Sequence, residues 1–444
     1  MTDLLRIGAS GISAYRSALS VVGENVANAE TKGYARRDVT LKETSVGGSG
    51  PLYRPSLSGG GVQATGVNRA WNDFKAADAR SAAGDAGSAG ARAQWLGAVE
   101  SALPDGDTGV SARITDFFNA ANRLSADPNG TLARTNTLSA LGDAVDAIKG
   151  AATGLGRVAE GISSDAASTV ASIDTNLAAL AKLNASLARA PDGTSAKASL
   201  SDERDRLLDD LSAQIGIDVK IASDGTAGVT LAGSPDTALV AGNQAASLAL
   251  SVAEDGRLSF SVDGAAKSPS GGRIAGLADA AAATADTRAS LDKVAVEFAG
   301  QLNSWQAQGR TPDKASGPAL LSVGATAASL ALATTNPAAI AAASADGTAN
   351  GNLTALADLR GADGAEARMS GIVTINAQAL AAATAQSTAA ATRRDAALVE
   401  RDDVSGVDLD REAAELIRFQ QAYDGSARVI QVARETLQSI LQLF

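Results

Sequence analysis

The residues best suited to chemistry lie together near the middle of the chain, in the segment SDERDRLLDDL. Asp202, Glu203 and Asp205 are close enough for paired carboxylates to act as a general acid and base, or to bind a divalent cation. Arg204 and Arg206 alternate with them, and opposite charges three or four residues apart on a helix also form solvated ion pairs. We expect the second interpretation, because a charge run on a helix is usually a solvated face.

Composition excludes several kinds of chemistry. The 444 residues include no His and no Cys, which removes the commonest acid–base side chain, thiol chemistry, disulfide bonds and the usual zinc ligands. Asp224-Gly225 and Asp255-Gly256 read as turns, since the other ligands of a calcium loop are missing. No Gly-rich loop precedes a helix where it could hold a phosphate. We therefore predict no catalytic residue, no metal site and no cofactor, in a protein that is not an enzyme.

Charge and hydropathy limit the partners. The net charge is −11, from 38 basic and 49 acidic residues without a basic block, so we expect no nucleic-acid partner. No apolar run reaches the roughly 18 residues that cross a membrane, so we expect no membrane insertion. The first 20 residues include Asp3, Arg6 and Arg16, which is typical of an amphipathic helix and not of a cleaved signal peptide.

The hydrophobic period changes along the chain and predicts an α+β fold made mostly of long helices. A period near 3.6 predicts helices over 3–29, 110–126, 199–215, 276–308 and 365–400, a weak Ala/Gly-rich helix over 76–93, and a rod-like helix or helix pair over 138–187. A period of two predicts a small antiparallel β domain inserted at 217–275, with a hairpin turn at Asp255-Gly256. Residues 31–70 are expected to be extended and mostly loop, and 310–362 irregular with short elements.

Both ends of the chain carry a heptad-like apolar stripe in which one position breaks the pattern. The exceptions are Gly8 in the first stripe and Ser426 in the second. Asp408 is expected to cap the last helix. Two terminal helices of the same period are natural partners for each other and for neighbouring copies, which favours a polymer subunit over an enzyme.

Two polar signatures carry a family resemblance. The N-terminal NVANAETKGYARR resembles the signature of bacterial flagellar axial proteins, the rod, hook and hook-associated subunits, and VDLDREAAELIRFQQAYDGSARVIQVARETLQSILQL resembles their C-terminal signature. Tyr34-Ala35-Arg36, the segment 201–219 and the segment DFFNAANRLSADP resemble the hook-associated members in particular. The middle is short and Ala-rich, so outer domains are expected to be reduced.

The resemblance implies a structural subunit at the junction between hook and filament. Such a subunit would be exported by the flagellar type III apparatus without a cleaved signal peptide. It would self-assemble into a ring at the distal end of the hook, and it would be located outside the cell in the flagellum. The implied partners are the hook protein, a second hook–filament junction protein, and an export chaperone bound to the C-terminal helix.

The implied domain organisation has three parts. Residues 1–40 and 405–444 would form an inner terminal coiled-coil domain, residues 41–216 and 276–404 a mainly helical middle domain, and residues 217–275 the inserted β domain.

The candidate assembly interface consists of the stripes and the turn that follows the first helix. Taken alone, Asn25, Asn28, Thr31, Gly33 and Tyr34 could simply end a helix, and Gln420 could be solvated or could bond between subunits. The predicted residues are Leu5, Ile12, Tyr15, Leu19, Val22, Asn25, Val26, Asn28, Thr31, Gly33, Tyr34, Leu416, Phe419, Gln420, Tyr423, Ile430, Leu437 and Ile440.

Three alternatives remain open at this stage. A hook or rod subunit would share both ends. A carboxylate hydrolase carried on a flagellar scaffold would use the cluster at 202–205, and a surface adhesin would use the β domain.

Overall fold

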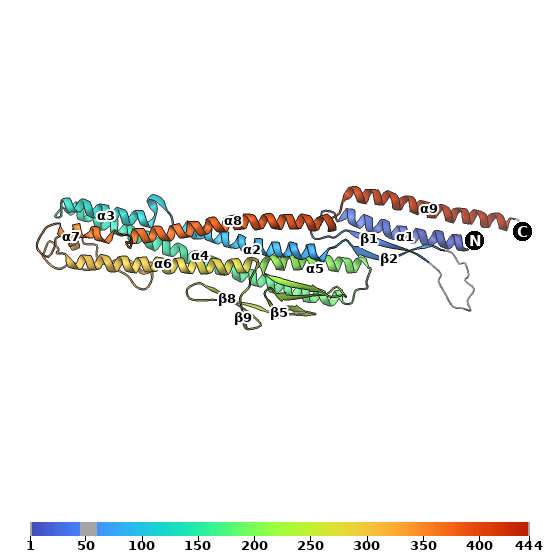
Figure 1. The fold of residues 1–444 in the computed structure, drawn as a ribbon, viewed down its shortest axis with the longest axis horizontal. Coiled ribbons are helices and arrows are strands. Elements are labelled where there is room, and N and C mark those ends of the chain that lie inside the picture. Colours follow the sequence, from blue (N-terminus) through green and yellow to red (C-terminus); the bar gives the residue numbers. More distant parts are fainter. Residues whose placement is uncertain (1, 45–59, 443–444) are drawn as a thin grey trace. The chain divides into compact units, whose positions relative to one another are not determined.

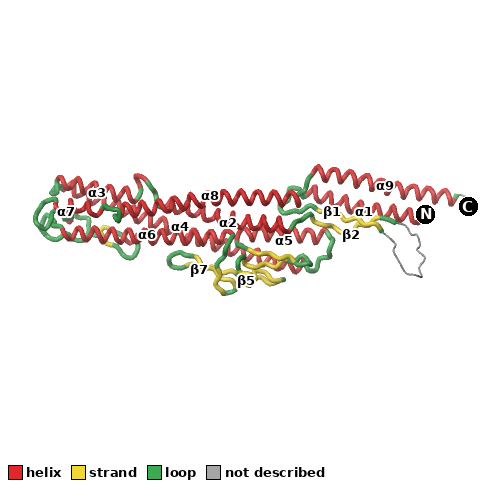
Figure 2. The backbone as a smooth tube through the Cα atoms, viewed as in Figure 1, coloured by secondary structure: helices red, strands yellow, loops and turns green. Residues whose placement is uncertain are grey.

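The computed structural model describes residues 2–44 and 60–442 and has the expected α+β composition, dominated by helices (Figure 2). Its contacts divide the chain into two compact units. The first unit draws on residues 1–84, 173–247 and 391–444, and the second on residues 85–172 and 248–390. These units group the chain differently from the three-part division expected from the sequence. That division stays a prediction.

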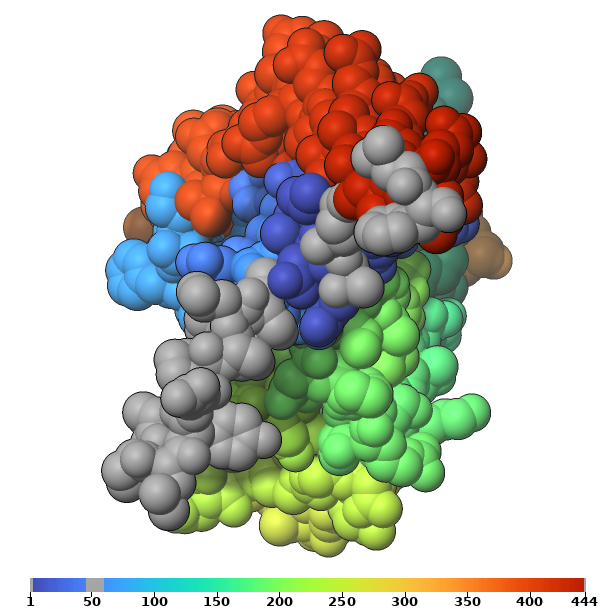
Figure 3. Space-filling model, turned by 90° about the vertical axis from the view of Figure 1, so that its right-hand side faces the viewer, coloured from blue at the N-terminus to red at the C-terminus, as the bar shows by residue number. Residues whose placement is uncertain are grey.

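The first unit contains the two terminal helices, α1 (Thr2–Ala27) and α9 (Leu409–Leu441), lying side by side (Figure 1). Their apolar stripes meet at a small core in which Ala18, Val22 and Phe419 are buried. The rings of Tyr15 and Phe419 lie 6.4 Å apart between centroids. In the space-filling view of Figure 3, the red surface of α9 lies against the blue of α1. The terminal helices therefore pair within one chain.

A β-hairpin follows α1, within the stretch expected to be extended. Strands β1 (Arg37–Glu43) and β2 (Val62–Arg69) are antiparallel, with a register shift between Thr40 and Leu41. Val39 and Leu41 pack against the α1–α9 core, which explains why apolar residues alternate with polar ones there. The Gly-rich stretch expected as loop at 45–59 lies outside the described residues.

The rest of the first unit joins α5 (Ser195–Gln214) and a four-stranded antiparallel sheet to the end of α4 (Thr131–Leu187). The strands follow the chain order β3 (Ile217–Ile221), β4 (Ala227–Leu231), β5 (Ser234–Ala241) and β6 (Gln244–Ala245). Asn184 of α4 fastens the sheet, because its buried amide donates to the carbonyls of Ala227 and Gly242, both at 2.8 Å.

The remaining strands of residues 217–275 belong to the second unit. They are β7 (Leu248–Val252), β8 (Leu258–Val262) and β9 (Ala265–Lys267), again antiparallel. Gly256 has φ = +94°, as the predicted hairpin turn between β7 and β8 requires. The segment expected to be one β domain therefore contains two separate sheets.

Long helices build the core of the second unit: parts of α2 (Asp73–Ala102), α4 and α8 (Ala365–Ser405), with α3 (Val110–Ala126) and α6 (Gly272–Gln308). One face of α6 is buried, and its Phe298 meets Phe117 of α3 edge to face, with 6.4 Å between the ring centroids. The segment 138–187, expected as one helix or a pair, lies within the single helix α4.

Glycines that weaken α4 and α6 by propensity allow their close packing. A Cβ on Gly161 would lie 2.6 Å from the ring of Trp95, and one on Gly276 would lie 2.1 Å from the carbonyl oxygen of Ser88. Both contacts are made with α2. The weak helix expected at 76–93 lies within this one uninterrupted helix. Packing outweighs propensity there.

Residues 310–362 contain only short elements, as expected. Buried amides of α6 hold them, for example Gln306, whose Nε2 donates to the carbonyl of Ala339 at 2.5 Å. The helical elements are α7 (Gly351–Ala355) and the 3-10 turns η2 (Ala327–Ser329), η3 (Pro337–Ala339) and η4 (Leu356–Leu359), with η1 (Gly106–Thr108) earlier in the chain; the strands are β10 (Leu321–Ser322) and β11 (Ala331–Leu332).

Candidate functional site

Asn25, the first residue of NVANAETKGYARR, is only 1% exposed and lies at the centre of a hydrogen-bond network. Its amide nitrogen donates to the carbonyl oxygen of Arg37 at 2.8 Å and to Oε2 of Glu412 at 3.0 Å. Its carbonyl oxygen accepts from the Tyr34 hydroxyl at 2.9 Å and from the backbone nitrogen of Arg37 at 3.0 Å. An asparagine side chain has two donors and two acceptor positions, so every one of them is used here.

Glu412 brings the C-terminal signature to the same place. It lies in the first turn of α9, is 1% exposed, and places its other oxygen 3.7 Å from the guanidinium of Arg36. Asp408 caps α9 as predicted, accepting from the backbone nitrogens of Asp410 and Arg411. The sequence indicated only that an acidic residue suits this helix start. The hydrogen bond between Asn25 and Glu412 connects the two signatures within one chain.

Tyr34, at the end of the turn after α1, donates its hydroxyl hydrogen bond to Asn25. Burial raises its pKa to about 12, while the nearby Arg37 acts in the opposite direction. The Arg37 guanidinium carbon lies 4.8 Å from the ring centroid, within the range of a cation–π contact. Tyr34 therefore stays protonated at neutral pH and keeps donating to Asn25.

The two exceptions in the apolar stripes lie where α1 and α9 pack closely against each other. A Cβ on Gly8 would lie 2.5 Å from Cγ1 of Ile430 and 3.1 Å from the carbonyl oxygen of Ser426. A Cβ on Gly11 would lie 2.4 Å from the Ser426 hydroxyl oxygen. The small residues are thus part of the contact between the helices.

The predicted interface residues separate into two sets. Most are buried or half-buried, which suits contacts within the helix pair and its joint. The exposed ones, which another molecule could reach, are Val26, Thr31, Gly33, Gln420 and Ile440. Their role between subunits stays a prediction.

Three exposed apolar residues of α9 lie outside the predicted interface. Leu409, Ile417 and Val432 are each more than half exposed, at 54%, 55% and 58%. Leu409 lies seven residues before Leu416 and continues the stripe that packs on α1, whereas Ile417 and Val432 lie off it. The sequence hint that they are exposed is that they lie among the charged residues of α9.

The cluster at 202–205 is not the solvated face expected from the sequence. Asp202 pairs with Arg37 and Arg69, each at 2.8 Å, and its side chain is 12% exposed. Burial raises the pKa of Asp202, with Arg69 and Arg37 acting against it. The expectation was wrong because the hairpin brings arginines that are more than 130 residues away in sequence.

The same network continues along α5. Asp205 is bonded to Arg69 and Arg204, each at 2.8 Å, and Asp209 to Arg80 at 3.1 Å and Arg401 at 2.7 Å. Glu203 and Arg206 form the one pair in this cluster that matches the expected exposed i,i+3 geometry.

The arrangement offers little for acid–base or metal chemistry. Each of the carboxylates at 202, 205 and 209 is neutralised by at least one guanidinium, whereas a general base needs a free carboxylate. No group of three His, Cys, Asp or Glu is placed to hold a metal ion in the described part of the chain.

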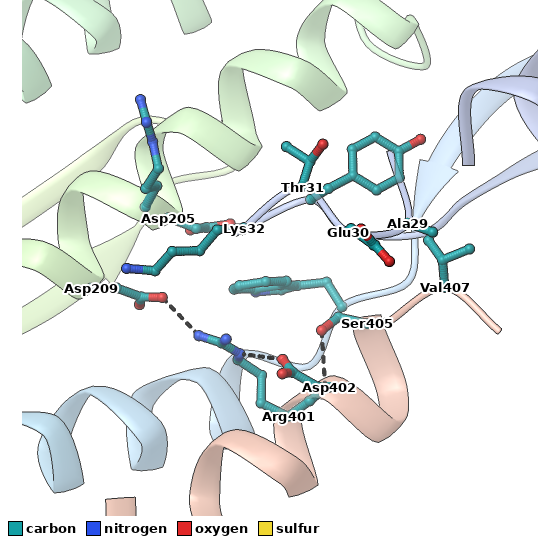
Figure 4. Close-up of a pocket in the computed structure, with 15 residues that line it drawn as sticks. Ala29, Glu30, Thr31, Lys32, Asp205, Asp209, Arg401, Asp402, Ser405 and Val407 are labelled. Carbon is teal, nitrogen blue, oxygen red and sulfur yellow. Dashed lines mark hydrogen bonds and ion pairs between the residues drawn. The ribbon is translucent and has the colours of Figure 1, made fainter. Parts of the chain in front are cut away.

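The turn at residues 29–34 borders a cavity of about 350 Å³ lined mainly by polar side chains. Figure 4 shows Arg401 reaching Asp209 and Asp402 near the segment that carries Thr31 and Lys32. A second cavity, lined by Glu24, Asn28 and residues of α5, also borders this turn. The exposed turn is therefore accessible between two hollows of the first unit.

Comparison with known sequences first defines the class. Residues 5–34 match the family described as flagella basal body rod protein, and residues 403–443 match the flagellar basal body rod FlgEFG protein C-terminal family. These segments are the paired helices and their joint, so the fold and site define a flagellar axial protein. Residues 96–321, slightly more than half of the chain, match the flagellar hook-associated protein FlgK helical domain. The chain belongs to this FlgK family of flagellar hook-associated proteins.

Individual relatives agree with this assignment. The chain is 27% identical over 340 residues to flagellar hook-associated protein 1 of Salmonella typhimurium, covering 73% of this chain and 60% of that protein. The Bacillus subtilis protein of the same name is 29% identical over 238 residues, covering 51% and 45%. The chain thus spans 60% or less of the length of these relatives.

A solved structure supports the fold. The flagellar hook junction protein FlgK from Burkholderia pseudomallei superposes with a TM-score of 0.66 at 16% identity, covering 74% of this chain and all of that one. Among the helices of the described residues, none has both the length and the hydropathy to cross a membrane.

Proposed function

We propose that the chain is a structural subunit of the bacterial flagellum at the junction between hook and filament. The observation that carries this proposal is the family match over residues 96–321. The two terminal matches alone would suit a rod or hook subunit equally well. The helical middle separates the junction role from these alternatives.

The terminal pair supports self-assembly into a ring at the distal end of the hook. Within one copy, Asn25 and Glu412 set the register of α1 against α9. The exposed members of the candidate interface, together with Leu409, Ile417 and Val432, are left to meet other molecules. Apolar surface of this kind is typical of an association surface. The predicted interface residues therefore act in two ways: by setting the register of the pair, and by direct contact.

The partners follow from the proposed position. They are the hook protein, a second hook–filament junction protein, and an export chaperone that covers the C-terminal helix before assembly. The outer side of α9 is suited to the chaperone, because its exposed apolar residues would otherwise be free in the cytoplasm. The chain would be exported by the flagellar type III system without a cleaved signal peptide, and it would work outside the cell as a non-enzymatic component.

Gene deletion in the source organism tests the proposal. Electron microscopy should show hooks without filaments, with flagellin lost to the medium. Missing hooks would instead make the chain a hook or rod subunit, which the terminal family matches favour as the second candidate. Normal flagella would contradict both roles.

A further inference from the structure

A cavity of about 430 Å³ in the second unit collects cationic side chains without matching carboxylates. It is lined at the start of α4 by Asn129 and Arg134, and in the irregular segment by Arg310, Lys314 and Asp346. Among the described residues, none of the three cationic side chains has an ion-pair partner. The network around Asp202 shows the opposite pattern, with a carboxylate for each arginine.

Arg134 is the most constrained of the three, at 5% exposed. Its Nε donates to the carbonyl of Pro128 at 2.8 Å and its Nη1 to that of Ile340 at 2.6 Å. Its Nη2 donates to none of the described residues, although the side chain lines the cavity. Burial lowers the pKa of Arg134, with no acidic group acting against it. A buried guanidinium that bonds only to carbonyls keeps an uncompensated charge.

The surrounding backbone adds positive potential. Arg134 lies in the first turns of α4, whose opening turn has no acidic residue, and the N-terminal end of a helix carries partial positive charge. Asp346, the one carboxylate in the lining, already accepts from the Ser344 hydroxyl and from the backbone nitrogen of Thr348. These hydrogen bonds lower its pKa, so it is ionised at neutral pH. The cavity still has two positive charges in excess.

We propose that this cavity binds an oxyanion, with Arg134 as the buried anchor and Arg310 and Lys314 at the rim. The shared chemistry is that of a phosphate or a carboxylate, which arginine binds through paired N–H groups and lysine as a point charge. The oxyanion comes either from a free phosphate or from an acidic side chain of a protein partner. The argument for this site does not use the proposed junction role, because it rests only on the residues that line the cavity.

Thermal unfolding of the full chain tests the proposal, comparing sodium phosphate, sodium acetate and sodium chloride at equal ionic strength and pH 7. The wild type should show a saturable rise in Tm above that in chloride. Arg310→Gln/Lys314→Asn should weaken the apparent affinity at least about tenfold, as expected for lost charged hydrogen bonds. Asparagine suits position 314 because its φ is +62°. A matched control is Arg157→Gln/Lys293→Gln, which removes two exposed charges of the second unit that do not line the cavity.

The anions distinguish the two sources. A response to phosphate that exceeds the one to acetate identifies free phosphate, and a response to acetate that exceeds the one to phosphate identifies a carboxylate. The proposal is overturned if neither anion exceeds chloride, or if the cavity variant responds like the wild type. Should the double variant fail to fold, Lys314→Asn alone, an exposed position, gives the same comparison.

Discussion

Ile430 of α9 packs over Gly8 of α1 so closely that a methyl group on Gly8 would lie 2.5 Å from Cγ1 of Ile430. The carbonyl oxygen of Ser426 would lie 3.1 Å from the same methyl group, so rotation of the isoleucine cannot make all the room. Glycine at this position lets the terminal helices approach each other within one chain. The contact joins a residue near the start of the chain to one near its end.

Substitution of Gly8 by Ala should therefore separate the helices. We expect a loss of about 1–3 kcal/mol in the stability of the α1–α9 pair, as for other overpacked contacts, measured by amide hydrogen exchange of α9. Gly23→Ala is the matched control, since nothing lies within 4 Å of its added Cβ. The control should be neutral or stabilise by about 0.5–1 kcal/mol, because alanine is the better helix former. Equal protection in both variants would contradict the close approach.

The second prediction concerns the hydrogen bond between Asn25 and Glu412. Asn25→Asp removes the donor to Glu412 and sets two carboxylates against each other, so urea unfolding should report a loss of at least about 2 kcal/mol. Adding Glu412→Gln restores a donor and should recover part of the loss. A double variant that is no better than the sum of the single ones would show that the two side chains are not coupled.

Tyr34 should titrate above the ordinary range of a tyrosine. Its pKa of about 12 exceeds the ordinary value of 10 because of burial, so ultraviolet absorbance should show one phenol ionising late, and Tyr34→Phe should remove that step. A raised folded pKa means that the stabilising contribution is present below pH 10 and is lost as the pH rises towards 12. A titration in which no phenol ionises above the ordinary range would contradict the burial of Tyr34.

Asp202 makes a fourth prediction, in the acidic range. Its folded pKa is raised by burial above the ordinary 3.8, so its contribution to stability is present below that value and is lost as the pH rises through the folded pKa. The wild type should therefore lose stability relative to Asp202→Asn over that range in urea unfolding. A rising wild-type advantage would mean that Arg37 and Arg69 outweigh burial.

The helices were predictable because their signal is local. The segment 110–126 matches α3, Asp408 caps α9, and the two terminal stripes pair. Each depends on the period of apolar residues or on a cap within a few positions.

The polar contacts were not predictable, since their partners are distant in sequence. Glu412 and Asn25 are separated by 387 positions, and Asp202 and Arg37 by 165. Nothing near either carboxylate shows that a hairpin or a helix end will cover it. Burial of charge depends on tertiary structure, so a run such as SDERDR looks the same whether it is solvated or enclosed.

The continuity of α2 was also hidden. The glycines in its Ala/Gly-rich sequence lower its helix propensity, but contacts such as Ser88 against Gly276 need small residues. Tertiary packing of this kind determined which helices are uninterrupted.

The central claim is that the chain occupies the hook–filament junction, and immunogold electron microscopy of intact flagella tests it most directly. An antibody raised against residues 217–275 should label a single narrow band where hook and filament meet. Label along the whole hook or in the rod would contradict the junction role and would place the chain with the other axial subunits.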